Sequence, residues 1–380
     1  MSDRRKLIAG AIGLVVATFL LTCGGLYYLL HVWTNDARGT IKLIRVVQLI
    51  KANYVEDVSI DDLMAGALKG AVNAIGDPHS IYLDSKMLKE FMIEAEGSFG
   101  GVGIVLGVKD KVLTVISPIE GTPGEQAGIK SGDQITKVNG QDTKDMALDE
   151  AVNKIRGVVG TQVTLTIARG QEVKDYCLTR SNIQIKTVSG KMLKDNIAYI
   201  RLSAFNENTG NDFIRQYNEL DQAGMKGIIL DLRDNPGGIL QESIKVASLL
   251  VPKGPIVSVV DRAGERDTSY STLDKVKYPL VVLVNGGSAS ASEIVAGAVQ
   301  DTKAGILVGT KTYGKGSVQT IKNLFDGTAI KLTIAKYLTP SDRSINGIGI
   351  EPDVKVEIPE NAMGDVQLEK ATEILKSKLQ

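Results

Sequence analysis

The sequence predicts a multidomain protein that combines α+β and α/β parts behind an N-terminal transmembrane helix and a helical arm. Three observations lead to this fold class. Residues 7–30 form an uncharged, apolar run that is long enough to cross a bilayer as a helix. A glycine-rich segment of short strands begins near residue 97. Beyond residue 190, apolar strands alternate with helices.

The apolar run follows the basic residues Arg4, Arg5 and Lys6. Positive charge before a span keeps the N-terminus in the cytoplasm and exports the chain that follows. A cleaved signal peptide is the alternative, but the run is long for the apolar part of a signal, and no A-x-A site follows it. We therefore expect residues 1–35 to be a cytoplasmic stub and an uncleaved, single-pass anchor in the cell membrane. All later domains would lie on the extracytoplasmic side.

Residues 36–95 predict a helical arm. Apolar residues recur at helical spacing from Leu43 to Ile50, and a second helical run extends from Asp62 to Ile75. That run ends at the turn-forming tripeptide Gly76-Asp77-Pro78. Such an arm could mediate a homodimer or only pack against the rest of the chain, and the sequence leaves both interpretations open.

Composition narrows the function classes. Lys plus Arg and Asp plus Glu are equal at 44 each, and the chain holds 6 Phe and 1 Trp, so neither charge nor aromatic stacking predicts nucleic-acid binding. The cysteines, Cys23 and Cys177, are too few for a disulfide framework or a zinc site. The only histidines, His31 and His79, lie in the first quarter of the chain. A hydrolase of this sequence would therefore use another general base.

Residues 96–182 predict a domain of strands with one helix. Strands are expected at 111–117, 132–138 and 163–167, and a helical face runs from Leu148 to Ile155. A glycine loop near the start presents successive backbone N–H groups suited to a peptide carboxylate, at Phe99, Gly100, Gly101, Val102, Gly103 and Ile104. The loop lacks the spacing of a dinucleotide fingerprint, and by itself it would also fit an ordinary hairpin.

Residues 183–358 predict an α/β core, and residues 359–380 a polar tail with a short terminal helix. Apolar strands of the kind buried in parallel sheets are expected at 197–202, 227–231, 279–284 and 306–308. Further strands are expected at 317–321 and 329–337, and helices at 213–220, 240–250 and 289–300.

Polar and glycine-rich loops follow strand ends of the predicted core, where ligands tend to bind. They span residues 231–238, 285–293 and 309–319. The second loop places Ser288, Ser290 and Ser292 at the start of a helix, where free N–H groups and the helix dipole stabilise developing negative charge. Spacing alone does not choose among these serines. Ser290 with Glu293 also fits a capping box, which would only begin the helix.

The third loop matches a phosphate-binding P-loop up to Lys315, but Gly316 stands where a magnesium-binding Ser or Thr is required. Nucleotide binding is therefore a distant alternative, and Lys315 becomes a candidate general base. A lysine in water has a pKa of about 10.4, which makes it a poor base at neutral pH. Burial in an apolar cleft disfavours the charged form, and neutral lysine could then take the proton of a serine.

The three loops, in this order and behind the glycine-loop domain, resemble those of the carboxyl-terminal processing peptidases, also called tail-specific proteases. The resemblance covers roughly residues 40–356. The stretch from Ser117 to Ile135 looks like the signature of a PDZ domain, so residues 96–182 are expected to bind protein C-termini by β-augmentation. For residues 183–358, the resemblance implies a protease core related to the crotonase and Clp-protease folds.

The resemblance also implies roles for individual residues. It places a nucleophile, a general base and an amide that orients the base at Ser290, Lys315 and Gln319. It places the two oxyanion-hole donors and a loop-shaping glycine at Gly238, Ala291 and Gly237. Supporting positions fall on Arg233, Glu293, Asp301 and Thr312. Arg156, at the end of the PDZ helix, is a candidate sensor of domain docking, although an ordinary arginine at a helix C-terminus would look the same.

These expectations together describe a serine endopeptidase that processes or degrades extracytoplasmic proteins selected by their unstructured C-terminal tails. We expect no metal or organic cofactor and no nucleic-acid partner, whereas a regulatory partner could gate the activity. The alternative from another class is a membrane-tethered PDZ scaffold that no longer cuts. The intact Ser290, Lys315 and Gln319 disfavour that alternative.

Overall fold

The computed structural model describes residues 2–34, 36–109, 112–324, 326–359 and 361–379. Lys111, the first residue of one predicted strand, lies outside the described residues. The chain divides into two compact units, residues 1–82 and 83–380, and each is described by itself.

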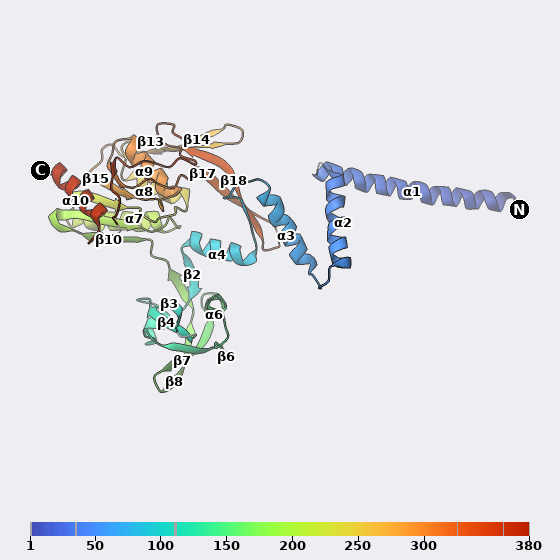
Figure 1. The fold of residues 1–380 in the computed structure, drawn as a ribbon, viewed down its shortest axis with the longest axis horizontal. Helices are drawn as coiled ribbons and strands as arrows, with labels where there is room; N and C mark the ends of the chain where they lie inside the picture. Colours follow the sequence, from blue (N-terminus) through green and yellow to red (C-terminus); the bar gives the residue numbers. More distant parts are fainter. Residues whose placement is uncertain (1, 35, 110–111, 325, 360, 380) are drawn as a thin grey trace. The chain divides into compact units, whose positions relative to one another are not determined.

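The first unit contains the helices α1 (Ser2–Thr34), α2 (Ala37–Asn53) and α3 (Ile60–Asn73), drawn in blue in Figure 1. The segment Ala11–Leu29 of α1 is long and apolar enough to cross a membrane, although a signal sequence would pass the same test. α2 begins at Asp36, whose carboxylate accepts the Gly39 N–H at 2.9 Å. α3 begins at Ser59, whose hydroxyl accepts the Asp61 N–H at 3.1 Å.

The strand β1 (Ile81–Leu83) leads into the second unit, where α4 (Ser85–Glu96) follows. The N-cap of α4 is Asp84, whose carboxylate accepts the Met87 N–H at 2.9 Å. α4 ends at Gly97, whose φ of 66° lies in the left-handed region that glycine adopts without strain. A polar first turn and a terminal glycine therefore set both ends of this helix.

The glycine-loop domain contains an antiparallel sheet whose strands are, in order, β3 (Ile104–Lys109), β4 (Val112–Pro118), β5 (Gln134–Val138), β7 (Gln162–Arg169) and β8 (Glu172–Thr179). β6 (Gln141–Asp142) pairs with β5, and β2 (Ser98–Gly101) pairs with β9 (Ser181–Gln184). The helices are α5 (Pro123–Gln126) and α6 (Leu148–Ile155). α6 buries Ala151 and Ile155 in the same core cluster as Ile135 and Leu165 of the sheet. The helical face predicted from Leu148 to Ile155 is therefore confirmed.

The α/β core is built on a second sheet whose strands are, in order, β10 (Val188–Met192), β11 (Ile197–Leu202), β12 (Gly227–Asp231), β15 (Leu280–Val284), β16 (Ile306–Gly309) and β19 (Val354–Lys355). β10 pairs with β11 in the antiparallel direction, and the other neighbouring pairs are parallel. The 3-10 helix η1 (Lys194–Asn196) joins β10 to β11. The strands predicted at 197–202 and 227–231 coincide with β11 and β12.

Helices cover both faces of this sheet, as the continuous apolar strands require. α7 (Thr209–Gln222), α8 (Leu240–Ser248) and α9 (Ala291–Asp301) contribute buried residues to one core cluster, and Figure 1 shows them against the sheet. α10 (Val366–Leu379) packs on the opposite face, where Ala371 and Leu375 are fully buried beside Ile229 and Val281. The short terminal helix predicted within the polar tail is therefore present, and it is part of the core.

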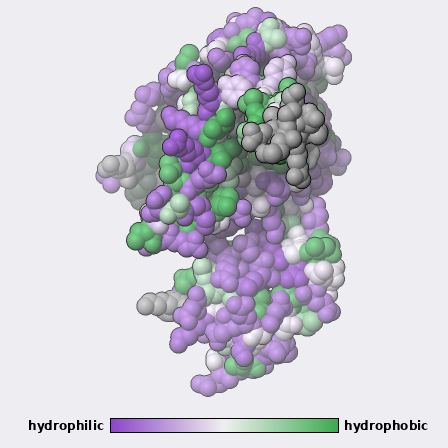
Figure 2. Space-filling view, turned by 90° about the vertical axis from the view of Figure 1, so that its right-hand side faces the viewer, coloured by the Kyte–Doolittle hydropathy of each residue, from purple (hydrophilic) through white to green (hydrophobic). Residues whose placement is uncertain are grey.

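A further antiparallel sheet lies beside these layers, with neighbouring strands in the order β17 (Ser317–Asn323), β18 (Ala329–Leu338), β13 (Gly254–Asp261) and β14 (Arg266–Ser271). The pairing of β17 with β18 contains a register shift between Val318 and Gln319. The sequence predicted β17 and β18 but missed β13 and β14, which form a hairpin. On the face shown in Figure 2, hydrophilic residues predominate and hydrophobic residues form small separate patches.

Candidate functional site

A cleft of about 790 Å³ lies at the ends of the core strands, where the three predicted loops meet. It is lined by Gly237, Gly238, Ser290, Ala291, Lys315 and Gln319, together with apolar side chains and Tyr337. The structure therefore brings together the predicted nucleophile, base, orienting amide and oxyanion-hole residues. Arg233, Glu293, Asp301 and Thr312 do not line this cleft.

The three serines of the second loop have different surroundings. Ser288 and Ser292 are both fully buried. The Ser288 hydroxyl donates to the Leu232 carbonyl at 2.8 Å, and the Ser292 hydroxyl donates to the Asn235 carbonyl at 2.9 Å. Ser290 is half-buried and lines the cleft. These contacts give Ser288 and Ser292 structural roles and leave Ser290 as the candidate nucleophile.

Ser290 sits on a sharp turn between β15 and α9. It is the N-cap of α9 and has a φ of 54°, a value that non-glycine residues seldom adopt. Its N–H donates to the Glu293 carboxylate at 2.9 Å, so the carboxylate half of the predicted capping box is present. The Glu293 N–H donates to the Ser290 carbonyl at 2.8 Å. The turn presents Ser290 at the positive end of the α9 dipole.

The first loop packs directly against this turn. Asn235 is fully buried, its carbonyl accepts the Ala289 N–H at 3.0 Å, and its side-chain oxygen accepts the Gly237 N–H at 2.9 Å. The next residues, Gly237 and Gly238, have φ values of 97° and 141°. A Cβ on Gly238 would lie 2.1 Å from the Phe205 carbonyl oxygen, so a side chain at this position has no room.

Two backbone N–H groups of residues that line the cleft are candidates for binding an oxygen anion. In the described part of the chain, no protein acceptor is recorded for the N–H of Gly238 or of Ala291, the first residue of α9. A Cβ on Gly237 would lie 2.8 Å from the Ala291 nitrogen, which shows how closely the first loop approaches the start of α9. Unpaired N–H groups beside a nucleophile are the elements of an oxyanion hole.

Glu293 holds the second and third loops together. Its side chain is fully buried and accepts four hydrogen bonds. One oxygen accepts from the Thr312 hydroxyl at 2.5 Å and the Gly314 N–H at 2.8 Å. The other accepts from the N–H groups of Ser290 and Lys315, both at 2.9 Å. Glu293 therefore ties the backbone of the second loop to that of the third, and neither Glu293 nor Thr312 lines the cleft.

Lys315 lies half-buried in the cleft, two residues before the start of β17. The strand that follows it, in place of a helix, agrees with the prediction that this loop is not a nucleotide-binding P-loop. Gln319 lies at the register shift of β17, and its side-chain nitrogen donates to Ser317 Oγ at 2.9 Å and Thr333 Oγ1 at 3.2 Å. Farther along the cleft, burial lowers the pKa of Lys331, and the nearby Glu94 carboxylate offsets this effect in part.

Arg233 anchors the base of the first loop. Its guanidinium donates to Asp231 at 2.6 Å and to the two carboxylate oxygens of Asp365 at 2.8 and 2.7 Å. Although burial opposes the charge, these carboxylates raise the pKa of Arg233. Asp365 immediately precedes α10, so the terminal helix is tied to the loop that carries Gly237 and Gly238. The sequence predicted Arg233 as a supporting residue but gave no sign of this partner.

Asp301 lies at the far end of α9, away from the residues that line the cleft. Its carboxylate accepts from the Ser341 N–H at 3.0 Å and the Ser341 hydroxyl at 2.5 Å, and it forms an ion pair with Arg343. Burial alone would raise its pKa, but these contacts lower it. Asp301 therefore stabilises the turn after β18.

The glycine loop of the first sheet is largely buried, and part of it is the strand β2. Gly103 has a φ of 71°, and its carbonyl accepts the Ile119 N–H at 2.8 Å. β3, which starts at Ile104, is an edge strand paired with β4 in the described sheet. The Arg156 guanidinium lies over the Phe99 ring at 4.2 Å, so this predicted sensor contacts the loop.

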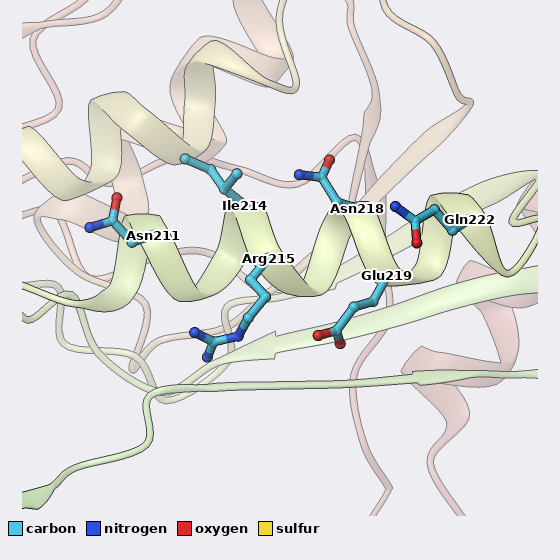
Figure 3. Close-up of a pocket in the computed structure, with 6 residues that line it drawn as sticks. All are labelled: Asn211, Ile214, Arg215, Asn218, Glu219 and Gln222. Carbon is cyan, nitrogen blue, oxygen red and sulfur yellow. The ribbon is translucent and has the colours of Figure 1, made fainter.

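A second hollow, of about 510 Å³, lies along α7 and is unrelated to these loops. Figure 3 shows that all six residues lining it project from this one helix, namely Asn211, Ile214, Arg215, Asn218, Glu219 and Gln222. It contains no pairing of a nucleophile with a base. The cleft at the strand ends is therefore the candidate active site.

Three family models match parts of this chain. Residues 196–356 match the model of peptidase family S41, residues 90–168 match the PDZ domain, and residues 30–87 match the activating protease CtpB N-terminal domain. The carboxy-terminal processing protease CtpA of Bacillus subtilis (strain 168) is 40% identical over 332 residues, which cover 87% of this chain and 71% of that protein.

Two further comparisons agree. A probable CtpA-like serine protease of Staphylococcus aureus (strain MRSA252) is 35% identical over 364 residues, covering 94% of this chain and 73% of that protein. Among solved structures, a photosystem II D1 C-terminal processing protease is similar with a TM-score of 0.51 at 30% identity. That similarity covers 89% of this chain and 97% of the other.

Proposed function

Because the chain belongs to the carboxy-terminal processing proteases of peptidase family S41, we propose that it cuts extracytoplasmic proteins with a Ser290–Lys315 dyad after its PDZ domain has bound their C-terminal tails. The observation that carries the proposal is the single cleft lined by Ser290, Lys315 and Gln319 beside the N–H groups of Gly238 and Ala291. The core that holds this cleft, a mostly parallel sheet covered by helices, supports a relationship to the crotonase and Clp-protease folds.

In the first half of the reaction, the neutral Nζ of Lys315 takes the proton of Ser290 Oγ as Oγ attacks the scissile carbonyl carbon. The carbonyl oxygen becomes an oxyanion and accepts hydrogen bonds from the N–H groups of Gly238 and Ala291. Removing one such donor from a serine protease typically costs about 10²- to 10³-fold in rate. Protonated Lys315 then donates its proton to the leaving amine, and the acyl group stays on Ser290.

In the second half, water attacks the acyl carbon while neutral Lys315 accepts a proton from it. The intermediate collapses, Ser290 Oγ leaves and regains a proton from Lys315, and the carboxylic acid product departs. Gln319 would orient the lysine during both halves. Every proton moves between groups of this chain, the substrate and water, so the chemistry needs neither a metal ion nor an organic cofactor.

The PDZ domain supplies the means to select substrates. An extended tail would add to the open edge of β3, and the backbone of residues 99–104 would hold its terminal carboxylate. Unstructured tails, which we expect to be apolar, suit this mode of binding because the added strand must be free of other structure. A chain whose terminal carboxylate is amidated should therefore be cut more slowly than the same chain with a free terminus.

The N-terminal unit would attach the enzyme to a membrane. We infer that α1 is an uncleaved anchor, supported by its apolar segment Ala11–Leu29 and by the basic residues before it. Alkaline extraction of membranes from cells that express the chain should leave it in the pellet. Release of the chain, or an N-terminus that begins after residue 35, would contradict an anchor.

The helical arm would join two copies of the chain, a proposal supported by exposed apolar residues on α2 such as Ile44 and Leu49. Light scattering of the chain in detergent should then give twice the monomer mass. A monomer mass would leave the arm a packing or regulatory element. A regulatory partner would be detected as a protein that changes the cleavage rate when added.

The dyad is tested with the full chain in detergent micelles and an unfolded protein that ends in an apolar tail. Wild type should cut it with or without EDTA, whereas Ser290→Ala and Lys315→Ala should not. Ser292→Ala is the matched control, because it removes a buried hydroxyl two residues away that lies outside the cleft lining. Cleavage by Ser290→Ala would contradict the assignment of Ser290 as the nucleophile. Loss of cleavage in EDTA would contradict chemistry without a metal ion.

A further inference from the structure

Two buried side chains, those of Glu293 and Tyr337, connect the backbone of Ser290 to that of Lys315. Glu293 accepts the N–H of both residues through one oxygen, at 2.9 Å each. On the carbonyl side, the Tyr337 hydroxyl lies 3.0 Å from the Ser290 oxygen and 2.6 Å from the Lys315 oxygen. The same two side chains therefore hold the peptide units of both residues.

Tyr337 is well placed to be a rigid support. It lies on β18, lines the cleft, and is 1% exposed. Its own N–H donates to the Gly316 carbonyl at 3.1 Å, next to Lys315. Burial, together with the charge of Glu293, raises the pKa of Tyr337 well above its ordinary value, so the hydroxyl remains a donor at any pH at which the enzyme works.

Support of this kind is needed because the two residues belong to different loops. Ser290 follows β15, whereas Lys315 precedes β17 of the other core sheet. Ser290 also holds an unfavourable φ of 54°, which persists where surrounding contacts over-determine it. A contact that joins both peptide units sets the separation of Oγ and Nζ more directly than one that holds either loop alone.

Resting on the proposed Ser290–Lys315 chemistry, we propose that Tyr337 is a positioning residue that sets the separation of Ser290 and Lys315 by sharing its one hydroxyl proton between the carbonyl oxygens of both. Tyr337 does not touch the substrate in this role. It acts through the two backbones, in concert with Glu293 on their N–H side.

The two carbonyls depend on Tyr337 to different degrees. The Ser290 oxygen also accepts the Glu293 N–H at 2.8 Å and the Ile294 N–H at 3.0 Å. The contact of Tyr337 with the Lys315 oxygen is the shorter of its two. Loss of the Tyr337 hydroxyl should therefore loosen chiefly the loop that carries Lys315. The consequence is impaired proton transfer, which lowers kcat, while the surfaces that bind substrate stay in place and KM changes little.

The test compares Tyr337→Phe with Tyr278→Phe in the full chain in detergent, alongside wild type and Ser290→Ala. Tyr278 is the matched control because its hydroxyl also donates to a partner, Asp221, outside the cleft. We expect Tyr337→Phe to lower kcat by about 10- to 100-fold with KM within about twofold.

The outcomes separate this inference from the proposed function. If Ser290→Ala is inactive and Tyr337→Phe keeps kcat within twofold of wild type, the positioning role is overturned and the dyad stands. If Tyr278→Phe loses as much kcat as Tyr337→Phe, the effect is a general loss of stability and the role is again overturned. If wild type does not cut, or Ser290→Ala does, the proposed function fails and takes this inference with it. Should Tyr337→Phe not fold, 4-methylphenylalanine at position 337 fills the volume of the hydroxyl without donating, and the same limits apply to it.

Discussion

Gly237→Ala adds one methyl group at the point where the first loop touches the nucleophile turn. A Cβ at this position would lie 2.6 Å from the Ala289 oxygen and 2.8 Å from both the Ala291 nitrogen and Ser290 Cβ. Carbon atoms rest at about 3.5–4.0 Å from their neighbours, so the turn and the loop must separate by roughly 0.7–1.4 Å. The substitution therefore displaces Ser290 from the oxyanion donors without removing any catalytic atom.

The magnitude follows from two effects. A non-glycine residue at a φ of 97° costs about 1–2 kcal/mol of folding free energy. The displacement costs activity, since a misplacement of 1 Å at an active site can lower the rate by about 10²-fold. Gly224→Ala separates the effects, because Gly224 has a φ of 84° in the same core but no atom within 4 Å of the place that a Cβ would occupy.

The assay measures kcat and urea unfolding for both variants. We expect similar losses of folding free energy from the φ strain, with a further loss for Gly237→Ala from the contacts. Activity should separate them clearly: Gly224→Ala within about twofold of wild type, and Gly237→Ala lower by about 10- to 100-fold. Wild-type activity in Gly237→Ala would refute the claim that this loop and the Ser290 turn must meet at this distance.

Three further predictions concern single side chains. Arg233 holds the pKa of Asp365 below its ordinary value despite burial, so Asp365 stabilises the fold above about pH 4 and that contribution is lost as pH falls through the lowered pKa. The melting temperature of Asp365→Asn should therefore lie below that of wild type at pH 7 and approach it at pH 3; a constant difference would contradict the ion pair. Glu293→Gln leaves buried N–H donors facing an amide nitrogen. It should lower the free energy of unfolding in urea by about 3 kcal/mol or more and remove most of the activity. An unchanged free energy and activity would show that other contacts hold the loops. Ser292→Ala removes one buried hydrogen bond and should cost about 1 kcal/mol with activity within about threefold, and an inactive but folded variant would make Ser292 the better candidate nucleophile.

The sequence predicted the parallel strands β11, β12, β15 and β16 because both of their faces are buried, but it missed β19, which has only two residues and is not buried. Strands such as Gly227–Asp231 and Leu280–Val284 are continuous apolar runs. Each run has five residues, which is too short for a typical helix. The hairpin of β13 and β14 was missed because Arg266–Ser271 is polar along its whole length. Its pairing with β13 includes a hydrogen bond between the hydroxyl groups of Ser258 and Thr268 at 2.8 Å, which no apolar pattern reveals.

The terminal helix was underestimated for a related reason. α10 is mostly polar, and it packs on the sheet through a few positions such as Ala371 and Leu375, which lie four residues apart on one face. The other apolar residues of this helix, Val366, Leu368, Ile374 and Leu379, are interspersed with charged and polar residues, so the sequence predicted only a short terminal helix. The ion pair between Arg233 and Asp365, which joins residues far apart in the chain, leaves no local pattern at all.

In the candidate site, too, the residues in recognisable local patterns were predicted and those that act through distant contacts were not. Ser290 and Lys315 lie in loops whose composition is visible in the sequence, Gln319 follows on β17, and the structure brings all three to one cleft. Asn235 and Tyr337 were not predicted, because each acts by bonding backbone groups of loops distant in sequence. Asn235 could have been suspected from its place between a buried strand and two glycines, whereas Tyr337 reads as one more apolar position of a strand.

The most direct test of the Ser290–Lys315 dyad is covalent labelling of the full chain with a fluorophosphonate, followed by peptide mapping by mass spectrometry. The dyad predicts one phosphonylated residue, Ser290, with no adduct in Ser290→Ala. It also predicts a labelling rate at least about 10²-fold lower in Lys315→Ala, because the serine then lacks its base. Labelling at another residue, or an undiminished rate in Lys315→Ala, would contradict it.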